Sequence, residues 1–119
     1  MKTFLDEGVP EGLEPYLAGR EVSTVKRKGW NSIKNGKLLA LIEKSGFEAL
    51  ITNDKRMERE QQLKRRPFAT LVLSTNHWPT MEPNVDKIAQ AVDDCKPGTV
   101  MLVECGRFVP SRFRRNPAP

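Results

Sequence analysis

Three acidic residues come shortly after apolar segments and could take part in the same chemistry. Asp6 and Glu7 follow the strand-like stretch 3–5, and Asp54 follows the apolar run 47–52 after one further residue. Carboxylates that converge from separate strands repel one another and raise each other's pKa unless a counter-charge is present. Mg²⁺ can supply that charge, because it takes oxygen ligands from one or two carboxylates and keeps several waters. Bound in this way, a metal ion activates water and stabilises the charge that develops on a phosphate.

A structural role is the alternative for each acid. Asp and Glu stabilise the N-terminus of a helix that follows them, through side-chain capping and the helix dipole. This explanation is sufficient for one acid. The presence of three such acids, Asp6, Glu7 and Asp54, favours a functional site.

The hydrophobic pattern predicts strands that alternate with helices. Strands are expected at 2–6, 20–29, 47–54, 68–76 and 98–104, and helices at 11–19, 35–46, 56–66 and 85–95. Strands that are apolar on both faces and alternate with helices are typical of a parallel sheet covered on both sides. We therefore expect one Rossmann-like α/β domain over residues 1–105, with about five mostly parallel strands. Active sites in such sheets lie outside the carboxyl ends of the strands, which is where the three acids fall.

Composition and charge describe a single globular domain with a basic surface. The chain has 119 residues, a net charge of +5 and a mean hydropathy of −0.54. It contains neither a membrane-length apolar run nor a signal-peptide pattern, and its two cysteines fit free thiols in the cytoplasm. Cations concentrate at 27–37, 55–66 and in the Pro-containing segment 106–119, which we expect to be disordered. Clustered cations indicate a polyanionic partner or a solvated basic face.

A receiver domain that is switched by phosphorylation would also place acids after the first and third strands. Asp6, Glu7 and Asp54 match that arrangement, and Ser74-Thr75 match the hydroxyl position after the fourth strand. A receiver also needs a Lys after the fifth strand, where this chain has Glu104 and Cys105. The receiver therefore remains a distant third hypothesis.

Several motifs in order over residues 3 to about 104 resemble the small PIN-like domains that act as ribonuclease toxins in bacterial toxin–antitoxin pairs. The matching motifs are Leu-Asp-Glu at 5–7, Asn-Gly-Lys-Leu-Leu at 35–39, Thr-Asn-Asp-Lys at 52–55 and Gln-Gln at 61–62. The resemblance implies an endoribonuclease that depends on Mg²⁺ or Mn²⁺, with RNA, a cognate antitoxin and a second copy of the chain as partners.

The resemblance also implies roles for individual residues. Asp6 and Asp54 would be the catalytic, metal-binding acids, with Glu7 as a further ligand. Supporting polar roles fall to Thr52, Asn35, Lys37, Lys55, Gln61, Gln62 and Asn76. Contacts to the RNA backbone, along one side of the acidic rim, fall to Arg56, Arg59, Lys64, Arg65 and Arg66.

One position departs from the PIN-like pattern. These relatives place Glu after Asn-Gly, whereas this chain has Lys37. A Lys there could reach Asp6 and Asp54 and neutralise them without metal. The alternative function is therefore a catalytically degenerate PIN-like module that binds RNA or an antitoxin.

Three ring side chains lie near polar turns and have two possible uses. His77 is the only histidine, so a His-based metal cluster or a Ser-His-Asp triad is excluded. We expect His77 to be an ordinary loop residue. Trp30 and Trp78 could stack on bases, although anchoring a loop to the core is the commoner use.

Overall fold

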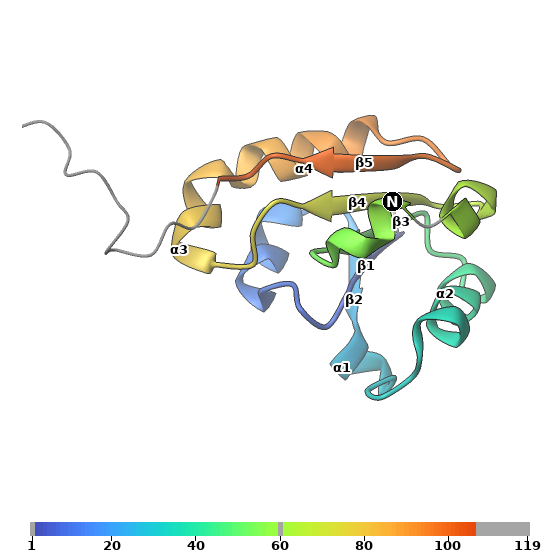
Figure 1. Ribbon diagram of the computed structural model, residues 1–119. Helices are drawn as coiled ribbons and strands as arrows, with labels where there is room; N and C mark the ends of the chain where they lie inside the picture. The colour runs from blue at the N-terminus through green and yellow to red at the C-terminus, as the bar shows by residue number, and fades with distance from the viewer. Residues whose placement is uncertain (1, 60, 107–119) are drawn as a thin grey trace, which may run out of the picture.

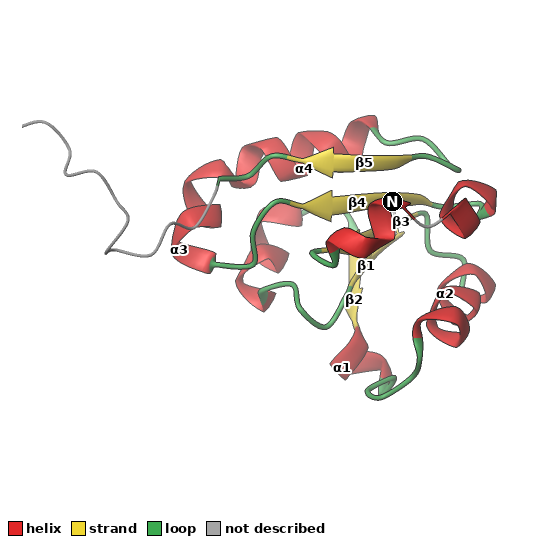
Figure 2. Ribbon diagram, in the orientation of Figure 1, coloured by secondary structure: helices red, strands yellow, loops and turns green. Residues whose placement is uncertain are grey.

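The computed structural model of the chain describes residues 2–59 and 61–106, and within these ranges the side chains of Asn35, Glu58, Arg59, Gln61 and Gln62 lie outside the description. Five strands form one sheet in the order β2-β1-β3-β4-β5, and every neighbouring pair is parallel. The strands are β1 (Lys2–Leu5), β2 (Glu21–Thr24), β3 (Ala49–Thr52), β4 (Ala69–Leu73) and β5 (Val100–Val103) (Figures 1 and 2). The α/β fold with a parallel sheet that the sequence predicts is confirmed.

Helices connect the strands, as parallel pairing requires. The α-helices are α1 (Val25–Lys28), α2 (Asn35–Lys44), α3 (Trp78–Met81) and α4 (Val85–Asp94). The 3-10 helices are η1 (Glu11–Leu17), η2 (Lys55–Arg59), η3 (Gln61–Arg65) and η4 (Glu82–Asn84). The short elements α3 and η4 are not predicted by the sequence pattern.

The strand expected at 20–29 is wrong in its second half. β2 ends at Thr24, whose side-chain oxygen accepts a hydrogen bond from the backbone N–H of Arg27 at 3.0 Å and caps α1. Gly29 then ends α1 in the left-handed conformation, with φ of 70°, which glycine adopts without steric cost. The alternating valines therefore belong to a strand followed by one helical turn.

Two hydrophobic cores cover the two faces of the sheet. On one face α2 packs over the sheet, and the core on this side includes Phe4, Leu39, Ile42, Leu50 and Val72. On the other face η1, α3 and α4 cover the sheet, and the core there includes Leu5, Leu13, Ile51, Leu71 and Ile88. β3 and β4 are buried along their whole lengths, which explains why their sequences are continuously apolar.

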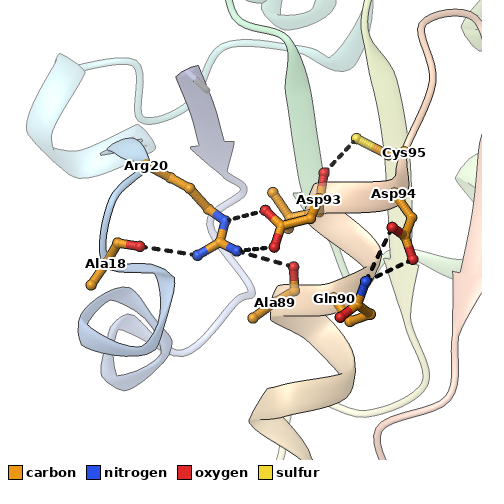
Figure 3. Close-up of polar contacts among 8 residues, drawn as sticks. Ala18, Arg20, Ala89, Gln90, Asp93, Asp94 and Cys95 are labelled. Atoms are coloured by element: carbon orange, nitrogen blue, oxygen red, sulfur yellow. Dashed lines mark hydrogen bonds and ion pairs between the residues drawn. The ribbon is translucent and has the colours of Figure 1, made fainter.

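An arginine ties the start of β2 to the far end of α4 (Figure 3). The guanidinium of Arg20 donates to both carboxylate oxygens of Asp93, at 3.0 Å and 2.5 Å, and to the carbonyl oxygens of Ala18 and Ala89. A bidentate arginine–carboxylate contact adds geometric specificity as well as energy. Arg20 therefore holds η1, β2 and α4 in one arrangement.

The described residues contain no helix with the length and apolarity that a membrane crossing needs. Cys95 and Cys105 are free thiols. Burial raises the pKa of the Cys95 thiol, and its Sγ lies 3.0 Å from the carbonyl oxygen of Val92. The predicted C-terminal tail lies almost wholly in 107–119, outside the described residues.

Candidate functional site

The acids that follow β1 and β3 meet at the carboxyl edge of the sheet. β1 and β3 are neighbours, and the backbone N–H of Asp6 donates to the carbonyl oxygen of Ile51 at 2.9 Å. The buried hydroxyl of Thr52 donates to Asp6 Oδ2 at 2.7 Å and accepts from the backbone N–H of Asp54 at 3.1 Å. A single threonine hydroxyl thus joins the two residues that the sequence singles out. Their metal-binding and catalytic roles remain predictions.

Glu7 directly follows Asp6 in the loop after β1. Its backbone N–H donates to Asp6 Oδ1 at 2.9 Å, so both Asp6 carboxylate oxygens accept a hydrogen bond from the protein. Asp6 and Glu7 line a cavity of about 170 Å³ at the ends of β1 and β2. The polar side chains that share this lining are Glu11, Thr24, Lys26 and Asn31. The cavity therefore carries three acids and one lysine.

A side-chain contact joins the loops that follow β1 and β3. Asn53 Nδ2 donates to the carbonyl oxygen of Gly8 at 3.1 Å. A Cβ atom added at Gly8 would lie only 2.4 Å from Asn53 Oδ1, so any other residue at this position would push the Asn53 side chain out of its present place. The glycine directly after Asp6-Glu7 was the available sequence signal, although its partner Asn53 could not be inferred from the sequence.

The cation beside Asp54 is Arg56. Both carboxylate oxygens of Asp54 accept from the Arg56 guanidinium, at 3.1 Å each, and Oδ1 also accepts from the Arg56 backbone N–H at 3.0 Å. These contacts hold the pKa of Asp54 below its ordinary value, and the side-chain hydrogen bond from Arg56 is the largest cause. The Arg56 side chain is 86% exposed and that of Asp54 is 23% exposed. Exposed ion pairs of this kind are weak, so a competing cation can displace the guanidinium.

Lys37, the position that departs from the PIN-like motif, is a residue of α2. It is exposed on α2 and lines a surface hollow with Ile33, Ala40, Leu41 and Lys44. Among the ion pairs of the described residues, none joins Lys37 to Asp6 or Asp54. Neutralisation of Asp54 therefore comes from within its own loop rather than from α2.

The remaining supporting residues are only partly described. Lys55 is exposed at the start of η2, directly after Asp54, and Asn76 is exposed in the loop that follows β4. The structure gives no side-chain positions for Asn35, Arg59, Gln61 and Gln62, so the contacts predicted for them lie outside the description. Their RNA-binding and supporting roles stay predictions.

Three of the predicted RNA-binding cations lie at the opposite edge of the sheet from the acids. The backbone carbonyls of Lys64 and Arg66 approach Gly98, just before β5 begins. Arg66 also pairs with Glu43 near the end of α2, at 3.5 Å. The segment with Lys64, Arg65 and Arg66 therefore leads into the amino end of β4, and the expectation that these cations line the acidic rim is wrong. A chain segment between β3 and β4 must return across the sheet before the next parallel strand begins.

The two tryptophans pack against other rings. The Trp30 ring lies 5.4 Å from that of Phe4, and the Trp78 ring lies 5.9 Å from that of Tyr16. His77 Nδ1 lies 2.8 Å from the Thr80 hydroxyl at the start of α3. These contacts favour the anchoring role for both tryptophans.

Comparisons with known proteins do not identify a function, so the functional inference rests on the sequence motifs and this geometry. A scan against models of protein families, a search of curated proteins and a search of solved structures each returned no match. Within residues 2–59 and 61–106, no group of three or more His, Cys, Asp or Glu side chains is placed to hold a metal ion. Asp6 and Asp54 follow neighbouring strands and lie at the same edge of the sheet.

Thr52→Val should show what the hydroxyl of Thr52 contributes to stability, because it removes the hydroxyl and keeps the side-chain volume. Valine fills the same buried space but leaves the Asp54 N–H and one Asp6 lone pair without their partner, so we expect a loss of about 1 to 3 kcal/mol in unfolding free energy. The amide of Asp54 should also exchange with solvent faster in Thr52→Val than in Thr52→Ser, which keeps the hydroxyl. Urea unfolding and amide-exchange NMR measure the two effects. Equal Asp54 exchange in both variants would show that the hydroxyl does not hold this amide.

Proposed function

We propose that the chain is a PIN-like, metal-dependent endoribonuclease that serves as the toxin of a toxin–antitoxin pair in the cytoplasm. The observation that carries the proposal is the Asp6–Thr52–Asp54 arrangement, in which one hydroxyl bonds the Asp6 carboxylate after β1 and the backbone N–H of Asp54 after the neighbouring strand β3. This edge of a parallel sheet is where α/β proteins place their active sites. The motifs at 5–7, 35–39 and 52–55 support the PIN-like assignment.

The oxygen donors present fit a hard divalent cation with few protein ligands. Asp6 and Asp54 would hold the ion, as Mg²⁺ commonly takes one or two carboxylates and fills the rest of its shell with water and substrate phosphate. When bound, the ion supplies an activated water and neutralises charge on the scissile phosphate. The residues of the chain itself position the ion and the RNA.

The protein residues hold this site in shape and receive the substrate. Thr52 fixes the Asp6 carboxylate and the Asp54 backbone, and the Asn53–Gly8 contact keeps the loops after β1 and β3 together. Lys26 lines the cavity next to Asp6 and binds a phosphate of the RNA. The net charge of +5 favours encounter with a polyanion.

A second candidate rests on the Asp54–Arg56 ion pair. Arg56 already engages both carboxylate oxygens of Asp54, which is the electrostatic role of a metal. If the Asp54–Arg56 ion pair persists in the functional protein, the chain is a PIN-like module that binds RNA or an antitoxin without cutting RNA.

Cleavage of single-stranded RNA with Mg²⁺ or Mn²⁺, and with a chelator instead, distinguishes the two candidates. The nuclease should cut RNA only when metal is present. Asp6→Asn should lower the cleavage rate by more than about a hundredfold, because even the loss of a residue that only orients a metal ligand costs up to about a hundredfold. The matched control is Glu14→Gln, because the Glu14 carboxylate pairs with Arg27 at 2.8 Å, outside the acidic site. RNA binding that is insensitive to the chelator, without cleavage, would reject the nuclease in favour of the degenerate module.

A further inference from the structure

The cavity at the ends of β1 and β2 combines buried apolar residues with exposed polar ones. Leu5, Val9 and Val25 line it and are 1%, 4% and 4% exposed. The exposed polar residues of the lining, which we call the rim, are Glu7, Glu11, Lys26 and Asn31. The volume of about 170 Å³ exceeds the ~150 Å³ in which a protein can bind one benzene ring. The cavity therefore has room for one flat ring system whose edge reaches the rim.

The rim has hydrogen-bonding capacity that the protein does not use. In the part of the chain that the structure describes, the side chains of Glu7, Glu11 and Asn31 form no hydrogen bond or ion pair. Glu11 begins η1, and Asn31 lies in the loop between α1 and α2. Two separate elements thus present a carboxylate and an amide to the same cavity, and both groups are available to a ligand.

The ligand that suits this lining is flat, apolar on its faces and rich in N–H groups at its edge. Asp6, Glu7 and Glu11 carry negative charge, so a phosphate inside the cavity would be repelled. Ionised carboxylates accept hydrogen bonds and cannot donate them, so they call for a ligand with donors. A nucleobase meets these requirements, because its faces pack on apolar side chains and its edge hydrogen-bonds to polar ones.

We propose that this cavity binds a guanine base of the RNA and that Glu11 selects it, an inference that rests on the proposed ribonuclease function. The Watson–Crick edge of guanine presents two adjacent N–H donors, which match the two oxygens of one carboxylate. Adenine, cytosine and uracil each place an acceptor beside their donor, and that acceptor would face a carboxylate oxygen. The amide of Asn31 completes the match by donating to the guanine carbonyl oxygen, and Lys26 holds the phosphate next to this base.

Glu11 is a better candidate for this role than Glu7. Glu7 directly follows Asp6, and the proposed metal ion would draw on its carboxylate. Glu11 lies on η1, four residues further along the chain, so its carboxylate stays available to the base when metal is bound. We therefore assign specificity to Glu11 and leave Glu7 with the ion.

Single-stranded RNAs that differ at one base test the cavity without changing the protein. With Mg²⁺ or Mn²⁺, cleavage beside guanine should be about thirtyfold faster than cleavage beside adenine, which lies within the range for one bidentate base contact. Inosine in place of guanosine should cost about tenfold, because it lacks the amino group and so loses one hydrogen bond to the carboxylate. Binding of the same RNAs in a chelator should follow the same order of bases.

Glu11→Gln should change which base is preferred. Glutamine presents one acceptor and one donor, the pattern that matches adenine, so the guanine preference should fall below about threefold while adenine gains. The cost of inosine should disappear in this variant. Glu21→Gln is the matched control, because it removes the same charge at the opposite end of β2 and should keep the preference for guanine. Circular dichroism of both variants confirms that they fold.

The outcomes separate this inference from the nuclease itself. Cleavage at all four bases with equal rates, or a guanine preference that Glu11→Gln leaves intact, would overturn the inference while the nuclease stands. Guanine-selective binding without cleavage would support the cavity and reject the nuclease. No base preference together with Glu11-dependent binding of free arginine would overturn the inference and assign the cavity to a guanidinium group instead.

Discussion

Replacing Phe4 by Ala should lower the free energy of unfolding by about 3 to 5 kcal/mol. The Phe4 side chain is fully buried, and its ring centroid lies 5.4 Å from that of Trp30 and 5.2 Å from that of Phe47. Its removal takes away the transfer free energy of a large apolar group and leaves a cavity between β1 and α2. A small domain has about 5 to 15 kcal/mol of stability in total, so this one substitution removes a large part of it.

Urea unfolding with linear extrapolation measures the Phe4 effect. Tyr16→Ala is the control, because it also truncates an aromatic ring, one that packs on Trp78 but is 45% exposed. Its cost should stay within about 1 kcal/mol. A Phe4→Ala loss no larger than that of Tyr16→Ala would mean that β1 is not anchored through this ring.

The fold was predictable because its main signals are local and agree with one another. β3 and β4 are buried on both faces, so each reads as an unbroken apolar run. The amphipathic spacing of α4 buries Val85, Ile88 and Val92. The failures came where one polar contact decides the conformation. The Thr24 cap turns 25–28 into helix, although the alternation of valines favours a continued strand.

The candidate site was predictable in its acids but not in their partners. Asp6 and Asp54 follow strands that topology makes neighbours, so parallel-sheet geometry alone brings them together. The cation that neutralises Asp54 could not be chosen from the sequence, since Lys37 and Arg56 are both candidates. Only the turn after Asp54, in which its carboxylate accepts the Arg56 backbone N–H, places the guanidinium there. Asp favours such turns, but the sequence does not show which cation they recruit.

Arg56→Gln should raise the affinity of the chain for Mg²⁺ about tenfold. The guanidinium supplies two of the three hydrogen bonds that Arg56 gives to Asp54 and all of the charge. Glutamine removes this internal competitor and leaves the backbone hydrogen bond in place. Isothermal titration of wild type and variant with Mg²⁺ measures the change. Arg66→Gln is the control, because Arg66 pairs with Glu43 at the opposite edge of the sheet and should leave the affinity unchanged.

The pH dependence of Arg56→Gln follows from the same contact. Arg56 holds the pKa of Asp54 below its ordinary value, so Asp54 contributes stability that is present above the unfolded carboxyl pKa and lost as the pH falls through the folded one. The stability advantage of wild type over Arg56→Gln should therefore be complete at neutral pH and vanish in acid. It should be small, because the ion pair is exposed. Carboxyl NMR should show a higher pKa for Asp54 in the variant. If that pKa rises while Mg²⁺ affinity stays the same, Asp54 is not a metal ligand, and the acids at this edge serve RNA or protein binding instead.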